Sequence, residues 1–242
     1  MSNILVTGGT NGLGKAIVAA LKDKTLYGKN HNIVIFDTEY GDDVRKADYA
    51  DIASGLRNMF DTDEEIPQLD VLINCAGVNK INWLENVSDD EWDEVMDVNV
   101  KGIFKMTKAC LPMLIKSKGT VLNIVSNAAH MPMTCSAAYN ASKGAALILT
   151  KQMARELTKA HGITVFSVSP NKLAGTKMSD SIDAQVVRTR GWTPEYAHEY
   201  QLKGLLTGEE TPPEAVAEFI AYLLQDKAHH KHLSGCDLPY GA

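Results

Sequence analysis

The sequence predicts an α/β fold built on a doubly wound parallel sheet in three layers. Along most of its 242 residues, short apolar segments alternate with segments of helical periodicity. The apolar segments show no polar alternation, which is typical of parallel strands buried on both faces. With 45% hydrophobic residues over this length, we expect a single domain spanning residues 1–242. Ligands of such a fold bind at the carboxyl ends of the strands.

Strands and helices can be placed from these patterns. The expected strands are residues 3–6, 31–37, 69–77, 119–126 and 162–170, and the expected helices are residues 15–23, 88–114, 139–161 and 211–226. Ser88 followed by Glu91 has the spacing of a capping box. Thr211 with Pro212 in the first turn marks the start of the last helix.

Composition excludes several classes of protein. The net charge of −6 without a long basic run argues against nucleic acid or an anionic membrane as partner. No apolar run approaches the length of a membrane span, and the first residues do not resemble a signal peptide, so we expect a cytoplasmic protein. The cysteines lack metal-type spacing and are expected to be reduced thiols. His229, His230 and His232 could ligate a metal, but a solvated loop explains them as well, and we expect no metal.

A glycine-rich turn joins the first strand to the first helix. Gly8, Gly12 and Gly14 form a GxxxGxG pattern in the strand–turn–helix context typical of dinucleotide binding. Glycines allow the backbone to approach a pyrophosphate, and the helix N-terminus meets its charge. A turn that binds nothing is the alternative.

Asp37 ends the second predicted strand, 23 residues after Gly14. A carboxylate at this place can accept hydrogen bonds from both hydroxyls of an adenosine ribose and would repel a 2′-phosphate. The sequence therefore favours NAD, with NADP the less favoured cofactor. A loop carboxylate without a ligand is the alternative.

Polar residues also end the third and fourth strands. Asn74 begins a small-residue stretch with Ala76 and Gly77, and Ser126 ends the fourth strand. Each of them alone could be only a turn or cap residue. Asn99 lies within an apolar helical face, where a buried amide needs a partner or could mark a kink that holds a water.

Tyr139 and Lys143 lie four residues apart on one predicted helix and therefore share a face. Such a pair alone could arise by chance. A free phenol has a pKa of about 10, and a nearby ammonium should lower it. A phenol with a pKa nearer to working pH is an effective general acid/base.

Taken together, these motifs resemble the compact single-domain branch of the short-chain dehydrogenase/reductase family, which has a Rossmann fold. The resemblance runs from residue 3 to about residue 170 and includes Ser169-Pro170. It implies a catalytic tetrad of Asn99, Ser126, Tyr139 and Lys143. The cofactor contacts it implies are Gly8, Thr10, Asn11, Gly12, Leu13, Gly14, Asp37, Asp48, Tyr49, Asn74, Ala76, Gly77, Tyr139, Lys143 and Pro170.

The chain departs from the family pattern at several places. Cys75 replaces an Asn, Asn171 replaces a Gly, and the stretch between Asp37 and Asp48 is too short for the usual helix and strand. These departures leave the substrate open. The substrate candidates are Ser126, His130, Met131, Met133, Lys172, Trp192 and Tyr196. Lys172, Arg188 and Arg190 could bind a carboxylate or phosphate, although solvated charge is the better interpretation for at least two of them.

The resemblance implies an NAD-dependent oxidoreductase that interconverts a secondary alcohol and a ketone, both small molecules. A catalytically silent NAD-binding regulator on the same fold is the alternative. A mobile substrate lid is expected over about residues 172–210, since long irregular segments are often functional. The resemblance also implies a homo-oligomer, a homotetramer or a dimer, paired through the helices that carry Asn99 and Tyr139.

Overall fold

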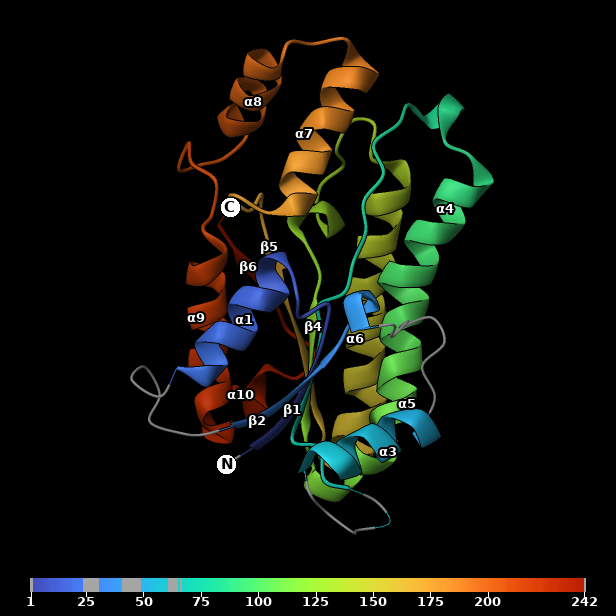
Figure 1. Ribbon diagram of the computed structural model, residues 1–242, viewed down its shortest axis with the longest axis vertical. Coiled ribbons are helices and arrows are strands. Elements are labelled where there is room, and N and C mark those ends of the chain that lie inside the picture. Colours follow the sequence, from blue (N-terminus) through green and yellow to red (C-terminus); the bar gives the residue numbers. More distant parts are fainter. Residues whose placement is uncertain (1, 24–30, 41–48, 61–64, 66, 242) are drawn as a thin grey trace.

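The computed structural model describes residues 2–23, 31–40, 49–60, 65 and 67–241. Within them, one parallel sheet has the strand order β2-β1-β3-β4-β5-β6 (Figure 1). Its strands are β1 (Ser2–Thr7), β2 (His31–Phe36), β3 (Val71–Asn74), β4 (Thr120–Ile124), β5 (Thr164–Pro170) and β6 (Asp237–Tyr240). The doubly wound α/β fold predicted from the apolar strand segments is thus confirmed.

Helices cover both faces of the sheet and extend beyond its carboxyl end. One face packs against α1 (Gly12–Lys22) and α9 (Pro213–Gln225). The other packs against α3 (Tyr49–Phe60), α5 (Gly102–Ser117) and α6 (Ala137–His161) (Figure 1). The remaining helices are α4 (Asp89–Met96), α7 (Lys177–Arg190), α8 (Pro194–Lys203) and α10 (Lys227–His230).

Alternation along the strands divides the core into two layers. In β1, Ile4 and Val6 pack towards α1 and α9, whereas Leu5 packs towards α3 and α5. In β5, Phe166 and Val165 divide in the same way. Because successive side chains of a strand point to opposite faces, an apolar run fills both layers and fixes the sheet between them.

Several elements differ from the sequence-based assignment. The helix predicted over 88–114 is α4 and α5 joined by a π turn, η4 (Asp97–Lys101). The capping box predicted at its start is present, since Ser88 and Glu91 bond reciprocally. Directly after β2 and Asp37 lies the 3-10 turn η1 (Thr38–Tyr40), and the rest of the shortened stretch before Asp48 lies outside the described residues. Helices α3, α7, α8 and α10 and strand β6 have no counterpart among the segments predicted from the sequence.

The segment expected to form a lid is largely helical. Helices α7 and α8 stand above the carboxyl ends of the strands (Figure 1). They enclose a small core of their own in which Ile81, Cys135, Val186 and Ala197 are buried together. Its mobility stays a prediction. In the part of the chain that the structure describes, no helix combines the length and apolarity needed to cross a membrane.

Candidate active site

The predicted site residues converge at the carboxyl ends of the strands. The glycine turn follows β1, Asn74 ends β3, and Ser126 lies two residues beyond β4. Helix α6 brings Tyr139 and Lys143 to the same edge through its first two turns. Parallel strands place these residues together because all their carboxyl ends meet at one edge.

Close backbone approach explains the glycine turn. A Cβ on Gly8 would lie 2.8 Å from the Ala76 Cα, and one on Gly14 would lie 2.1 Å from the Gly8 carbonyl oxygen. Gly8 and Gly12 also adopt positive φ angles of 69° and 49°. Only glycine combines these contacts and conformations without strain. The turn after β1 is therefore held directly against the turn after β3.

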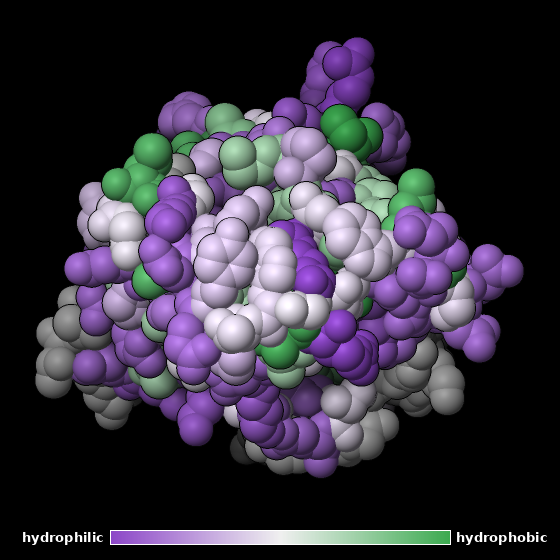
Figure 2. All heavy atoms as spheres, turned by 90° about the horizontal axis from the view of Figure 1, so that it is seen from above, coloured by the Kyte–Doolittle hydropathy of each residue, from purple (hydrophilic) through white to green (hydrophobic). Residues whose placement is uncertain are grey.

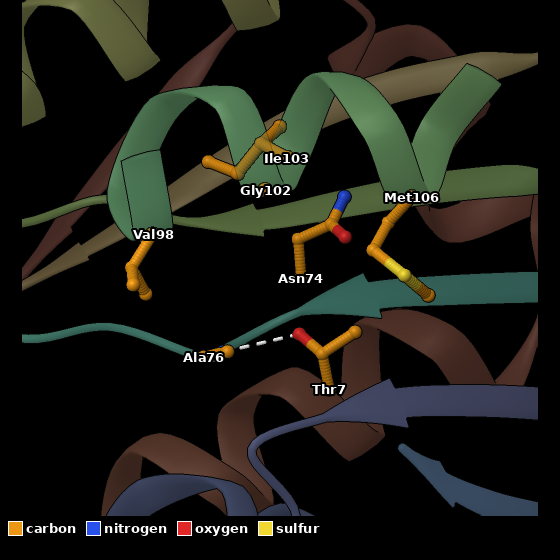
Figure 3. A pocket seen from close by; sticks show the side chains of 7 residues that line it. All are labelled: Thr7, Asn74, Ala76, Val98, Gly102, Ile103 and Met106. Carbon is orange, nitrogen blue, oxygen red and sulfur yellow. Dashed lines mark hydrogen bonds between the residues drawn. The ribbon is translucent and has the colours of Figure 1, made fainter. Parts of the chain in front are cut away.

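Thr7 fastens these two turns to each other. Its Oγ1 accepts hydrogen bonds from the amides of Cys75 and Ala76, at 3.0 and 3.1 Å (Figure 3). Behind it, seven residues pack so closely that the gap between them has no room for a water molecule. They are Thr7, Asn74, Ala76, Val98, Gly102, Ile103 and Met106. This region is a rigid floor for the site and not a binding pocket.

Helix α1 presents its N-terminus to the glycine turn. Its N-cap residue Asn11 makes no capping hydrogen bond with its side chain. The Asn11 amide instead donates to Thr10 Oγ1 and Glu39 Oε1, at 2.9 and 2.5 Å. The first amides of the helix thus lack a side-chain acceptor, which leaves them suited to an anion. Together with the glycine turn, this arrangement fits the pyrophosphate of a dinucleotide.

The carboxylate of Asp37 is buried and held in place by its neighbours. Its Oδ2 accepts from the Thr10 amide and hydroxyl at 3.0 and 2.8 Å, and its Oδ1 accepts from the Glu39 amide at 3.1 Å. Burial raises the pKa of Asp37, but the hydrogen bonds from Thr10 and Glu39 outweigh it, and the net pKa lies below the ordinary value. Asp37 is therefore ionised at neutral pH. Glu39 adds a second carboxylate, 3.8 Å from the Lys177 ammonium.

Tyr139 and Ser126 form the centre of the site. Tyr139 is only 8% exposed, and its phenol lies beside the hydroxyl of Ser126. Burial raises the pKa of Tyr139, and the Ser126 hydroxyl offsets part of that rise. The expected lowering by Lys143 was wrong for this state of the protein, because desolvation of the phenolate dominates. The Lys143 Nζ lies 5.6 Å from the centre of the tyrosine ring.

Lys143 is buried beneath the site, with 5% of its surface exposed. Its ammonium donates to the Ile124 carbonyl at 3.1 Å. Burial lowers its pKa to about 8, and the electrostatic effect of Cys75 acts in the opposite direction. The same burial raises the pKa of the Cys75 thiol to about 12, so this thiol is neutral at physiological pH.

Asn99 lies in the π turn and is 1% exposed. Its amide donates to the Val78 carbonyl and to Ser142 Oγ, at 2.9 and 3.0 Å, and its Oδ1 accepts from the Val78 amide at 2.9 Å. A Cβ on Gly77 would lie 3.4 Å from Asn99 Oδ1 and 3.8 Å from Lys143 Nζ. The side chains of Asn99 and Lys143 therefore both lie close to Gly77. The predicted kink is present as a π turn, and a water bound there stays a prediction.

The substrate candidates divide into two groups. Ser126 lies beside Tyr139, whereas His130 turns to β6 and bonds to Asp237 at 2.7 Å. Lys172 is used internally, in ion pairs with Asp183 and Glu210 at 2.6 and 3.3 Å. The others lie on the exposed rim or against α7 and α8, and they are Met131, Met133, Trp192 and Tyr196.

Two polar residues of this region were missed by sequence reasoning. Asp237 accepts from His130, Ser167 and Ser169, and so anchors the loop after Ser126 to β5 and β6. Thr176 caps α7, and its Cβ would lie 3.6 Å from a Cβ on Gly12. The cap pattern of Thr176 was visible in the sequence, whereas no local pattern joins Asp237 to His130, 107 residues away.

The remaining predicted residues are Asp48, Tyr49, the C-terminal histidines and the cysteines. Asp48 is outside the described residues, and the side chain of Tyr49 is too. The three C-terminal histidines do not form one cluster, since His230 is buried against Thr120 and Leu223 while His229 stacks on Tyr222. All four cysteines are free thiols, with Cys236 exposed.

Comparison with known proteins decides the family. The profile described as short chain dehydrogenase matches residues 2–186. The chain belongs to the short-chain dehydrogenase family. It is therefore an oxidoreductase of a family that uses a nicotinamide cofactor, and the Rossmann-type sheet and glycine turn are the family's own.

Curated relatives cover almost the whole short-chain dehydrogenase chain. A 3-oxoacyl-[acyl-carrier-protein] reductase from Staphylococcus epidermidis is 28% identical over 254 residues, with 96% of this chain and 93% of the relative covered. An acetoacetyl-CoA reductase from Paracoccus denitrificans is 30% identical over 234 residues, covering 93% and 90%. Among solved structures, a short chain dehydrogenase family protein from Francisella tularensis has a TM-score of 0.81 at 24% identity, covering 99% and 96%. An actinorhodin polyketide ketoreductase variant with NADPH has a TM-score of 0.82 at 24% identity, covering 98% and 95%.

Proposed function

We propose that the protein is an NAD(H)-dependent oxidoreductase that interconverts a secondary alcohol and a ketone, with Tyr139 as general acid/base. The observation that carries this proposal is the buried Tyr139 phenol with Ser126 beside it and the buried Lys143 ammonium one helical turn away, next to the glycine turn. Curated relatives named as reductases of 3-oxoacyl and acetoacetyl groups support a carbonyl as the reacting group.

Each member of the tetrad has a distinct task in this proposal. The nicotinamide, when bound, supplies or accepts the hydride. Tyr139 donates its phenol proton to the substrate oxygen during reduction and takes it back during oxidation. Ser126 orients that oxygen, Lys143 holds positive charge beneath the phenol, and Asn99 keeps the π turn and the Lys143 region in register.

Tyr139 and Lys143 set the direction of pH dependence. The raised pKa of Tyr139 keeps it a phenol at neutral pH, which suits reduction. Lys143, with its pKa at about 8, is an ammonium below that pH and loses its charge above it. Reduction should therefore be sustained below pH 8 and weaken above it, whereas oxidation should gain as the pH rises.

Asp37 and Glu39 support NAD as the cofactor. Both carboxylates lie at the end of β2, where they would repel a 2′-phosphate. Two structural neighbours contain NADPH and NADP, but those chains are 24% and 20% identical to this one, so the likeness carries only the fold.

Replacing Asp37 by Ala tests the cofactor. The wild type should prefer NADH over NADPH in kcat/KM by about 10- to 100-fold, since a hydrogen bond to a charged group contributes about 1.5–3 kcal/mol. Asp37→Ala should lose most of this preference, whereas Asp93→Ala, at an exposed position of α4, should keep it. Steady-state kinetics with both cofactors measure the ratio. Equal use of NADH and NADPH by the wild type would contradict the cofactor proposal.

A panel of ketones and secondary alcohols, followed by NADH absorbance, tests the reaction itself. Turnover of at least one member is expected. The alternative, a catalytically silent regulator, predicts calorimetric binding of NADH without turnover of any of them. A cytoplasmic location and the absence of a nucleic-acid partner stay predictions.

We further propose that two copies pair through α4, α5 and α6. An open groove of about 380 Å³ there is lined mainly by apolar side chains, and both Phe104 in its lining and Ile148 on α6 are exposed. The lining residues are Met96, Asp97, Val100, Lys101, Phe104 and Leu149.

Light scattering after size exclusion should give a dimer or tetramer of the 26.4 kDa chain. Phe104→Glu should shift the mass towards the monomer, because burying an unpaired charge opposes association. Leu206→Glu, at an equally apolar and more exposed position away from this groove, is the matched control. A monomeric wild type would contradict the pairing.

A further inference from the structure

Lys172, Arg188 and Arg190 are the three cations that the sequence offers as candidates for binding an anion, and the structure separates them. Lys172 is satisfied by Asp183, Glu210 and the Gln201 amide oxygen. Arg188 is exposed on α7. Arg190 differs from both, since it is half-buried at the end of α7 and forms no ion pair with any described carboxylate.

The guanidinium of Arg190 is fixed but largely unpaired. Its Nη2 donates to the Thr134 carbonyl at 2.9 Å, and its plane lies over the rings of Trp192 and Tyr200, at 4.7 and 5.5 Å from their centres. Its Nε is buried and has no acceptor. A guanidinium carries five N–H donors, and among the described residues the Thr134 carbonyl is the one hydrogen-bond acceptor that it meets.

The position of Arg190 is on the substrate side of the site. Thr134, which it contacts, belongs to the loop that runs from Ser126 to Tyr139. The adjoining Thr189 makes two hydrogen bonds to the loop after β3. Its Oγ1 donates to the Ile81 carbonyl, and its own carbonyl accepts from Trp83 Nε1. The end of α7 is thereby held against the two loops that leave β3 and β4.

An aromatic surface surrounds this cation. Trp192 packs at 4.9 Å between ring centres against both Tyr196 and Tyr200, and the two tyrosines are about half exposed. Met131 and Met133 are exposed on the loop that contains Thr134. Seen from this end of the molecule, near-white and green side chains gather around purple ones (Figure 2). The surface thus offers apolar contact around one fixed positive charge.

A donor of a charged group that is buried without a hydrogen-bond acceptor lowers the stability of the folded protein. The aromatic rings offset part of this cost by cation–π attraction. The rings offer no hydrogen-bond acceptor to the edge of the guanidinium, however, and such a planar edge matches a carboxylate through two parallel hydrogen bonds.

We propose that Arg190 is a specificity-determining residue that binds a carboxylate on the substrate, at the end remote from the reacting carbonyl. The apolar part of such an oxo acid would lie along Trp192, Tyr200 and Met133. This inference rests on the proposed ketone reductase function and adds the substrate class to it. We commit to a carboxylate over a phosphate because a planar anion fits beside the flat rings of Trp192 and Tyr200 better than a tetrahedral one.

Matched pairs of substrates test the proposal. They are 4-oxopentanoate, 5-oxohexanoate and 6-oxoheptanoate, each with its methyl ester and with an oxoalkyl phosphate of similar length. For at least one length, the wild type should prefer the acid over the ester in kcat/KM by about 10- to 100-fold, the range for a hydrogen-bonded charge. Arg190→Gln should remove this preference by lowering kcat/KM for the acid far more than for its ester. Arg190→Lys should restore only part of it, because a point charge replaces the planar fork.

Arg188→Gln, two residues away and exposed, is the control and should keep the preference. Ester turnover and circular dichroism melting show whether Arg190→Gln is folded. Equal turnover of acids and esters by the wild type at every length, or a preference that survives Arg190→Gln, would overturn the proposal. A preference for the phosphate over the acid would overturn the carboxylate assignment.

Calorimetry separates this proposal from the proposed function. Binding of an oxo acid with NADH present, lost in Arg190→Gln and absent for the ester, would support Arg190 even if no ketone were turned over. That result would contradict only the reductase function. Turnover of neutral ketones without selective binding of any acid would contradict only Arg190.

Discussion

Replacing Tyr139 by Phe is expected to lower kcat for ketone reduction by about 10²- to 10⁴-fold, the usual contribution of a positioned general acid. The phenol oxygen is the only group removed, and the buried ring of Tyr139 keeps its packing. Ser126 Oγ accepts from the Ala128 amide at 3.1 Å, and Tyr139→Phe does not touch this hydrogen bond. The Ser126 loop should therefore stay in place.

The measurement is steady-state reduction at pH 7, alongside NADH binding by calorimetry. Binding should change little, because Tyr139→Phe leaves the glycine turn and Asp37 intact. Tyr222→Phe, an exposed tyrosine that stacks on His229 on α9 and α10, should keep full activity. Full turnover by a Tyr139→Phe protein would assign the proton transfer to another group.

The sequence could predict those features of the site that follow from helical spacing and sheet topology. Tyr139 and Lys143 share a helical face by periodicity alone, and the strand ends bring Ser126 to them through topology. Burial does not follow from spacing, however. The pKa of Tyr139 was therefore expected to fall, whereas the desolvated phenol shows a rise.

The difference between local pattern and burial also explains which elements of the fold were predicted and which were missed. The apolar strands β1 to β5 were predicted because burial on both faces leaves a continuous apolar run. Helix α7 was missed although Thr176 caps it and Gly191 ends it, with φ at 69°. Its apolar face covers only the small core around Val186, so its periodicity is weak. The anchor formed by Asp237 joins residues far apart in the chain, which no local pattern records.

Replacing Gly14 by Ala should have the second large effect, on both cofactor binding and stability. The new Cβ would lie 2.1 Å from the Gly8 carbonyl oxygen and 2.8 Å from the Gly8 carbonyl carbon. Both are backbone atoms, so no rotation of a side chain can relieve the overlap. Overpacking in a tight site costs about 1–3 kcal/mol or more, and here the strain moves the turn that meets the pyrophosphate.

Gly55→Ala is the matched control for this substitution. Gly55 lies exposed in α3, and a Cβ there would meet nothing within 4 Å. Because Ala is the better helix former, that variant should be more stable than the wild type by about 0.5–1 kcal/mol. Urea unfolding and NADH calorimetry on the two variants measure both effects.

The two glycine variants separate a general effect of alanine from a local clash. Gly55→Ala raises helix propensity, and its new Cβ contacts no other residue. Any loss of stability or NADH affinity in Gly14→Ala must therefore come from the close approach of α1 to the turn after β1. That approach depends on Gly8 as well, whose own Cβ would meet the Ala76 backbone. A Gly14→Ala protein with wild-type NADH affinity and stability would show that the first turn can move away from β1 without cost. The glycine turn would then not be the rigid cradle on which the cofactor proposal depends.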